Sequence, residues 1–201
     1  MSWIKTINYE KANSKLKRVF DKVKGPDNNI DNVLMVHSLR PHSLVGHMTL
    51  YKNILHNSGN TIPKWYLEAL GVYTSKLNFC DYCVKHHFTG FKRLLNNNTK
   101  ADDFLEAVTN NALDNFFDAK LYQGFVYAKK LTLDLENIIE NDVIELRKVG
   151  FNDGEILEIN QVVSYFNYVN RTVVGLGVNL KGDILGLSPN NSNDPDQWNH
   201  Q

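Results

Sequence analysis

Apolar residues recur at spacings of three and four along most of this chain, the period that places side chains on one face of an α-helix. No segment shows the period-two alternation that is typical of a half-buried strand. The pattern therefore predicts an all-α protein. Its helices are expected over residues 12–23, 43–58, 61–77, 80–95, 99–108, 121–131, 143–149 and 152–174.

Turn and capping residues divide these helical segments. Gly25 and Pro26 end the first segment, and Pro63 is expected in the first turn of the third. Residues 99–102 have the spacing of a capping box, with Asp in place of the usual Glu, and residues 152–155 form a second cap-like start.

Residues 1–187 are predicted to form a single helical domain, because no repeat and no linker interrupts them. Residues 188–201 are polar and rich in helix breakers, so they are expected to be disordered or to lie as an arm on a neighbour. Trp198 is the apolar residue in this tail that favours the arm.

Composition narrows the class of protein. The 201 residues are 42% hydrophobic with a formal net charge of zero, so no overall field favours nucleic acid or an anionic membrane. The apolar stretches are too short to span a bilayer, and the first residues lack a signal-peptide pattern. Together with two closely spaced cysteines, these features predict a cytoplasmic protein with neither nucleic acid nor membrane as a partner.

Cys80 and Cys83 are the two cysteines of the chain, and they form a C-x-x-C motif. A disulfide that closes so short a loop restricts little unfolded-chain entropy, so a structural staple is disfavoured. The motif therefore indicates either a redox dithiol or part of a metal site.

Helical geometry places the candidate catalytic residues in one stripe, on one face of a helix. At about 100° per residue, Cys80, Cys83 and His87 share one face if Cys80 opens a helix. Free backbone N–H groups at that helix start favour a thiolate, and His87 is placed to accept its proton or to stabilise it.

Glu68 precedes Cys80 by twelve residues and lies in an apolar and aromatic stretch. Burying an isolated carboxylate is costly, so from the stretch alone a solvated face is the favoured prediction for Glu68. A role in proton transfer is the alternative.

Zinc is the main physical rival to redox chemistry, because Cys80, Cys83, His86 and His87 are four potential ligands. Four ligands within eight residues of one helix cannot all point at one ion, so no metal is predicted. His86 lies off the stripe and is expected to be a hydrogen-bonded or interface histidine.

Glu68, eleven intervening residues and then Cys80-x-x-Cys83-x-x-His86-His87 make a specific combination. With this combination of residues the chain resembles the alkylhydroperoxidase D-like (AhpD-like), or carboxymuconolactone decarboxylase-like, family. The similarity is specific over about residues 40–100 and looser as far as 187.

This resemblance implies a helical-bundle antioxidant oxidoreductase that oligomerises through helix packing, as a dimer or a trimer of dimers. By analogy, Cys83 attacks a hydroperoxide and Cys80 condenses with the sulfenic acid, while His87 and Glu68 assist proton transfer. The partner would be a dithiol reductant, either a small molecule or a thioredoxin-like protein. The dithiol itself carries the electrons, so no cofactor is implied.

Tyr82 departs from the best-known family pattern, which has a histidine immediately before the second cysteine. A phenol is a poor base near neutral pH, so the proton relay is expected to be shorter, water-bridged or weaker. A tyrosine at this position is common in the peroxidase-related branch of the family.

Two other functions remain open from the sequence. One is a non-enzymatic redox-sensing or binding module, and the other is a lactone decarboxylase, which needs no cysteine pair. Asn167, Asn170 and Arg171 lie among aromatic residues of the last helix and face either the thiol pocket or a subunit interface.

Overall fold

The computed structural model describes residues 2–187 and Trp198. Nine α-helices and no strand occur in this described part of the chain. They are α1 (Ser14–Val23), α2 (Asn32–Met35), α3 (Pro41–Leu55), α4 (Lys64–Leu77), α5 (Asp81–Leu95), α6 (Asn98–Thr109), α7 (Ala119–Leu133), α8 (Glu140–Lys148) and α9 (Asp153–Gly175). Single 3-10 turns cover Pro26–Asn28, Leu113–Asn115 and Leu135–Asn137. The all-α prediction is confirmed.

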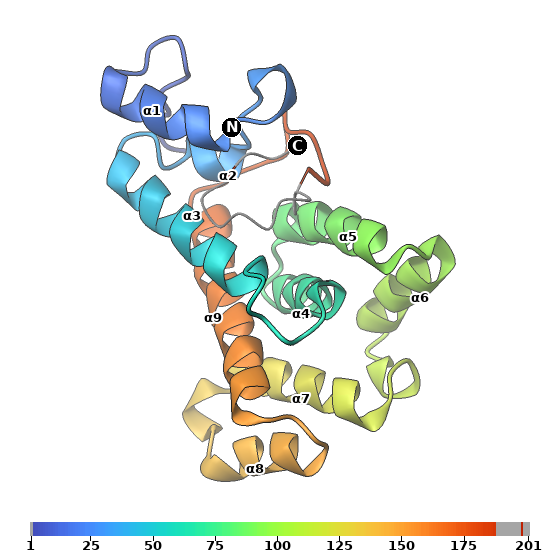
Figure 1. The fold of residues 1–201 in the computed structure, drawn as a ribbon. Coiled ribbons are helices and arrows are strands. Elements are labelled where there is room, and N and C mark those ends of the chain that lie inside the picture. The colour runs from blue at the N-terminus through green and yellow to red at the C-terminus, as the bar shows by residue number, and fades with distance from the viewer. Residues whose placement is uncertain (1, 188–197, 199–201) are drawn as a thin grey trace.

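Helix α4 occupies the centre of the bundle, where Figure 1 shows it end-on with α5, α7 and α9 around it. It contacts α3, α5, α7 and α9, and nearly every position from Tyr66 to Ser75 is buried. Helix α9 runs along one side of the molecule and packs against both α3 and α7. A polar side chain between Tyr66 and Ser75 is therefore placed in the interior.

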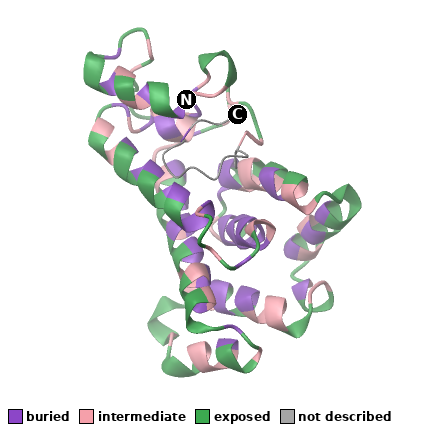
Figure 2. Ribbon diagram, viewed as in Figure 1, coloured by how far each residue is buried: buried purple, intermediate pink, exposed green. Residues whose placement is uncertain are grey.

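Burial follows the helical period that the sequence shows. In Figure 2 the inward faces of the helices are buried and their outward faces are exposed. The buried apolar side chains, among them Phe20, Tyr66, Phe104 and Phe166, form one contiguous cluster. Within the described residues, no helix combines the length and the apolar character that crossing a membrane requires.

The helix starts confirm one capping prediction and correct two. Asn152 accepts a hydrogen bond from the Glu155 N–H at 3.0 Å, and Glu155 accepts one from the Asn152 N–H, a complete capping box. Helix α4 starts one residue after Pro63, which is the N-cap and not a first-turn residue. Asn97 caps α6 by accepting from Lys100 N, so the capping box expected at residues 99–102 is wrong.

Two features of the structure have no counterpart in the sequence prediction. Helix α2 has only four residues, too few to show a period. A segment over residues 176–187 passes from the end of α9 back to α2 and α5. The predicted tail lies outside the described residues except for Trp198, which is buried with the Lys22 ammonium 5.3 Å from its ring centre.

Gly71 allows α4 and α9 to approach closely. A methyl group at this position would lie 2.2 Å from ring carbons of Phe166, a fully buried side chain. That distance is far below van der Waals contact, so any larger residue would force the two helices or the ring to move.

We expect Gly71→Ala to lower the free energy of unfolding by about 1–3 kcal/mol, because overpacking displaces the Phe166 ring. Gly46→Ala is the matched control: Gly46 lies exposed in α3 with open space at its methyl position, so alanine should raise stability by up to about 1 kcal/mol. Urea denaturation of the three proteins measures both effects. Equal effects of the two substitutions would contradict this account of the α4–α9 contact.

Candidate active site

The corner between α4 and α5 positions the two thiols. Helix α4 ends at Leu77 with Asn78 as its C-cap, the backbone of Phe79 adopts a left-handed φ of 56°, and Cys80 is the N-cap of α5. The N–H of Cys80 donates to the Ser75 carbonyl at 2.9 Å, which ties the start of α5 to the last turn of α4. Cys83 then lies in the first turn of α5, as predicted.

Both cysteines are free, buried thiols with their sulfur atoms 3.0 Å apart. The hydrogen bond with Cys83 lowers the pKa of the Cys80 thiol, against the effect of burial. Burial, followed by the neighbouring Cys80, raises the pKa of Cys83 well above its ordinary value. The pair is therefore arranged to lose one proton readily and the second with difficulty.

Cys83 and His87 line a cavity of about 50 Å³. Apolar and aromatic side chains make most of its wall, including Met48, Tyr51, Tyr165 and Val169. Among the described residues, the wall includes Cys83 but not Cys80. A small molecule in this cavity would therefore meet the Cys83 sulfur beside the His87 imidazole.

Glu68 meets His87 at the centre of the bundle. Its Oε2 lies 2.7 Å from His87 Nδ1, and the residue is only 1% exposed. The predicted solvated face for Glu68 is therefore wrong, because its partner comes from α5, nineteen residues away. A carboxylate only accepts hydrogen bonds, so Nδ1 carries the proton and Nε2 is left to accept another. This is the arrangement of a histidine base oriented by a carboxylate.

The four predicted site residues, Cys80, Cys83, His87 and Glu68, thus lie together in the structure. No family model and no curated protein matches the chain.

Solved structures do match. A peroxidase-related protein of Ralstonia eutropha JMP134, described as an alkylhydroperoxidase AhpD core, aligns with a TM-score of 0.74 and 21% identity over 92% of this chain and 97% of that one. The fold is that of the AhpD-like proteins. A peroxidase-related protein of Silicibacter sp. TM1040 aligns with a TM-score of 0.66 and 25% identity over 75% of this chain and 77% of that one.

The debrominase Bmp8 shares the AhpD-like fold. A Cys→Ala variant of it, solved with 2,3,4-tribromopyrrole, aligns with a TM-score of 0.70 and 16% identity over 89% of this chain and 93% of that one. Proteins described as peroxidase-related and a debrominase therefore share this helical scaffold, so the fold alone does not select one reaction.

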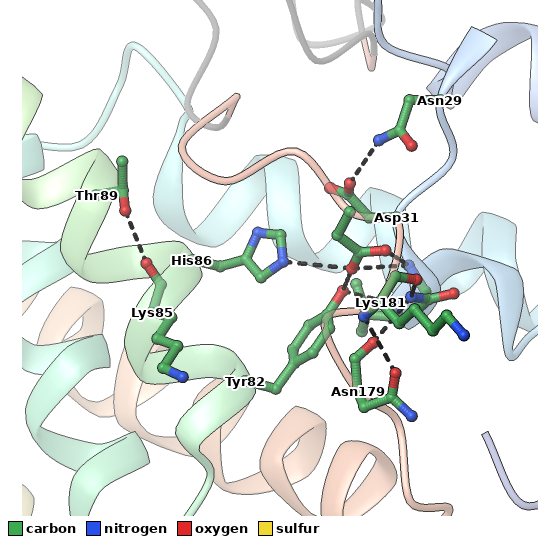
Figure 3. Close-up of polar contacts among 11 residues, drawn as sticks. Asn29, Asp31, Tyr82, Lys85, His86, Thr89, Asn179 and Lys181 are labelled. Carbon is green, nitrogen blue, oxygen red and sulfur yellow. Dashed lines mark hydrogen bonds and ion pairs between the residues drawn. The ribbon is translucent and has the colours of Figure 1, made fainter. Parts of the chain in front are cut away.

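Tyr82, at the position of the usual AhpD relay histidine, takes no part in the Glu68–His87 contact. Its hydroxyl donates to the Asp183 carboxylate and accepts from Val33 N at 3.1 Å. In Figure 3 the Tyr82 hydroxyl and the His86 ring are directed at the same carboxylate, which is that of Asp183. Glu68 and His87 are therefore in direct contact, without Tyr82 between them.

Asp183 is the residue of this region that the sequence prediction missed. Its carboxylate accepts from the Asn32 N–H at 3.1 Å and lies 3.4 Å from His86 Nε2, at ion-pair distance. Its segment follows the last helix and shows no period. A carboxylate next to Gly182 reads as an ordinary turn, so the sequence offers no signal for it.

The zinc alternative has no geometric support here. His87 turns toward Glu68 and His86 toward Asp183, so the two rings diverge. In the part of the chain that the structure describes, no cluster of three or more His, Cys, Asp or Glu side chains is placed to hold a metal ion.

Thiolate absorbance at 240 nm of the reduced protein should rise in two separate steps with pH. The first step belongs to Cys80 and should lie below the pKa of an ordinary cysteine thiol, because the hydrogen bond with Cys83 lowers the Cys80 pKa. The second belongs to Cys83 and should lie well above that value.

Substitution of each cysteine tests this assignment. Cys83→Ala removes the largest influence that lowers the Cys80 pKa, so the remaining step should move upward. In Cys80→Ala the step should stay above 8.5, because burial is the largest influence on Cys83. Two thiols that titrate together near 8.5 would contradict the coupling.

Proposed function

We propose that this protein is a thiol peroxidase that reduces small organic hydroperoxides through the Cys80–Cys83 dithiol. One observation carries the proposal: two free thiols 3.0 Å apart at a helix start, one of them on the wall of a small cavity beside an imidazole oriented by a carboxylate. This arrangement supplies a nucleophile, a base and a second thiol that can form a disulfide.

In the first step the Cys83 thiolate attacks the outer oxygen of ROOH. The S–O bond forms as the O–O bond breaks, giving Cys83–SOH and an alkoxide. The protonated His87 donates its Nε2 proton to the alkoxide, which leaves as ROH, and Glu68 stabilises the positive charge that the ring carries before this transfer. His87 takes up the one proton that the Cys80–Cys83 pair loses when its thiolate forms, so the step is balanced.

In the second step the Cys80 sulfur attacks Cys83–SOH. The Cys80–Cys83 disulfide forms and water leaves. An external dithiol then exchanges with this disulfide and restores both thiols. The sum is ROOH plus a dithiol giving ROH, water and a disulfide, without a metal or an organic cofactor. The dithiol is a small molecule or a thioredoxin-like protein.

The lower pKa of Cys80 and the nucleophilic role of Cys83 are compatible. Cys80 lies away from the cavity, and its thiolate is one hydrogen bond from the Cys83 sulfur. Transfer of the Cys83 proton across this 3.0 Å contact leaves the charge on Cys83, the sulfur that faces the cavity. Cys83 is then the attacking sulfur, because it is the one that a peroxide in the cavity would contact.

Reductive dehalogenation is a second candidate, which the aromatic cavity wall and the match to the debrominase Bmp8 favour. The same dithiol would supply two electrons: an aryl bromide and two thiols would give the arene, HBr and the Cys80–Cys83 disulfide. A brominated pyrrole is the appropriate probe, and bromide release with disulfide formation would support this reaction.

We expect Cys83→Ser to abolish consumption of cumene hydroperoxide with dithiothreitol as reductant. With no dithiothreitol present, Cys80→Ser should react once and retain a sulfenic acid on Cys83, because the second thiol is missing. Mass spectrometry after dimedone trapping identifies the modified cysteine. Full turnover by Cys83→Ser, or a dimedone adduct on Cys80 in the Cys83→Ser protein, would overturn the assignment of Cys83.

Glu68→Gln should slow sulfenic acid formation by about 100-fold or more. The neutral amide can still accept a hydrogen bond from His87 Nδ1, but it does not stabilise the positively charged imidazole. Stopped-flow measurement of the first turnover isolates this step from reduction by the dithiol. An unchanged rate in a folded Glu68→Gln protein would show that Glu68 only orients the ring.

A further inference from the structure

Asn170 is a buried amide that the peroxide reaction above does not use. It lies on α9, is 1% exposed, and faces the corner between α4 and α5. Burying a primary amide is favourable only where its donors and acceptors are satisfied. The partners of Asn170 therefore indicate what holds it in the core.

The orientation of the Asn170 amide follows from two hydrogen bonds. Its Oδ1 accepts from Asn78 Nδ2 at 3.0 Å, and its Nδ2 donates to Ser75 Oγ at 3.0 Å. Asn78 also donates to Asn167 Oδ1 at 3.0 Å, which fixes Asn78 in turn. One N–H of Asn170 is left after these contacts, since a primary amide has two.

Ser75 connects the Asn170 amide to the start of the thiol helix. Ser75, which accepts from the Asn170 side chain, also accepts the backbone N–H of Cys80 through its carbonyl. A hydrogen bond from Asn170 lowers the pKa of Cys80 and opposes the rise in the pKa of Cys83. Asn170 is not among the described residues that line the cavity, so its amide lies outside the space in which a substrate would bind.

We propose that Asn170 stabilises the sulfur anion shared by Cys80 and Cys83, donating its free amide N–H from outside the substrate cavity. This role rests on the dithiol function proposed above. A neutral donor suits a buried site, because it strengthens a hydrogen bond to an anion without requiring a second buried charge.

The same donor sets the redox balance of the dithiol. A thiolate gains from the N–H of Asn170, whereas a neutral disulfide sulfur is a much weaker acceptor. Stabilising the reduced form makes a disulfide easier to reduce. Asn170 therefore favours regeneration of the dithiol as well as formation of the nucleophile.

The test compares Asn170→Leu with Asn160→Leu in the reduced full-length protein. Asn160 lies on the same helix and donates to Tyr127, and ten residues of helix place it about 15 Å from Asn170. Two readouts are measured: thiolate absorbance at 240 nm against pH, and the equilibrium constant for disulfide exchange with glutathione.

We expect Asn170→Leu to raise the first thiol pKa by about one unit, so that the thiolate fraction below that pKa falls about tenfold. The equilibrium with glutathione should shift about tenfold toward the protein disulfide. Asn170→Asp, which adds a negative charge at the same position, should raise the pKa further. Asn160→Leu should change neither quantity.

An unchanged pKa and an unchanged glutathione equilibrium in folded Asn170→Leu would overturn the proposal. Where circular dichroism shows that this variant is unfolded, Asn78→Ala decides, because it removes the hydrogen bond that orients the amide and should shift both quantities in the same direction. The readouts need no peroxide. A protein that ignores peroxide yet shows these shifts disproves the peroxidase and retains the role of Asn170.

Discussion

The hydrogen bond between Glu68 and His87 determines how α5 is rotated, and the rest of the site depends on that rotation. A carboxylate at the centre of a helical bundle is costly unless a partner reaches it, and that partner must come from α5. Fixing His87 against Glu68 fixes the rotation of α5 about its own axis. Cys83, one helical turn earlier, then faces the cavity, and Cys80 falls at the helix start.

Two sets of polar groups surround the thiol pair, one on the cavity side and one outside the cavity. His87, to which we assign proton exchange, lies on the cavity side with Glu68 against its ring. The amide of Asn170 and the N–H groups at the start of α5 are fixed dipoles, to which we assign stabilisation of the sulfur anion. Separating the proton-transfer groups from the anion-binding groups allows each to be tuned by its own neighbours.

Sequence reasoning predicted the helices and the position of the two thiols at a helix start because both depend on local spacing. The stripe of Cys80, Cys83 and His87 follows from helical geometry alone. The burial of Glu68 does not, because its favourable environment comes from a helix that the local sequence does not show. Asn170 was placed on the correct helix, but the choice between thiol pocket and subunit interface required the packing of α9 against α4.

Asp183 shows how the segment after the last helix completes the site. By accepting from Tyr82 and from the start of α2, it holds the residue between the two cysteines to a part of the chain that is remote in sequence. A histidine in place of Tyr82 would offer this carboxylate a proton-transfer group, whereas the tyrosine offers only a hydrogen-bond donor whose pKa burial raises further. Tyr82 therefore attaches the thiol helix to α2 and to the 176–187 segment, and the proton transfer proposed above is assigned to His87 and Glu68.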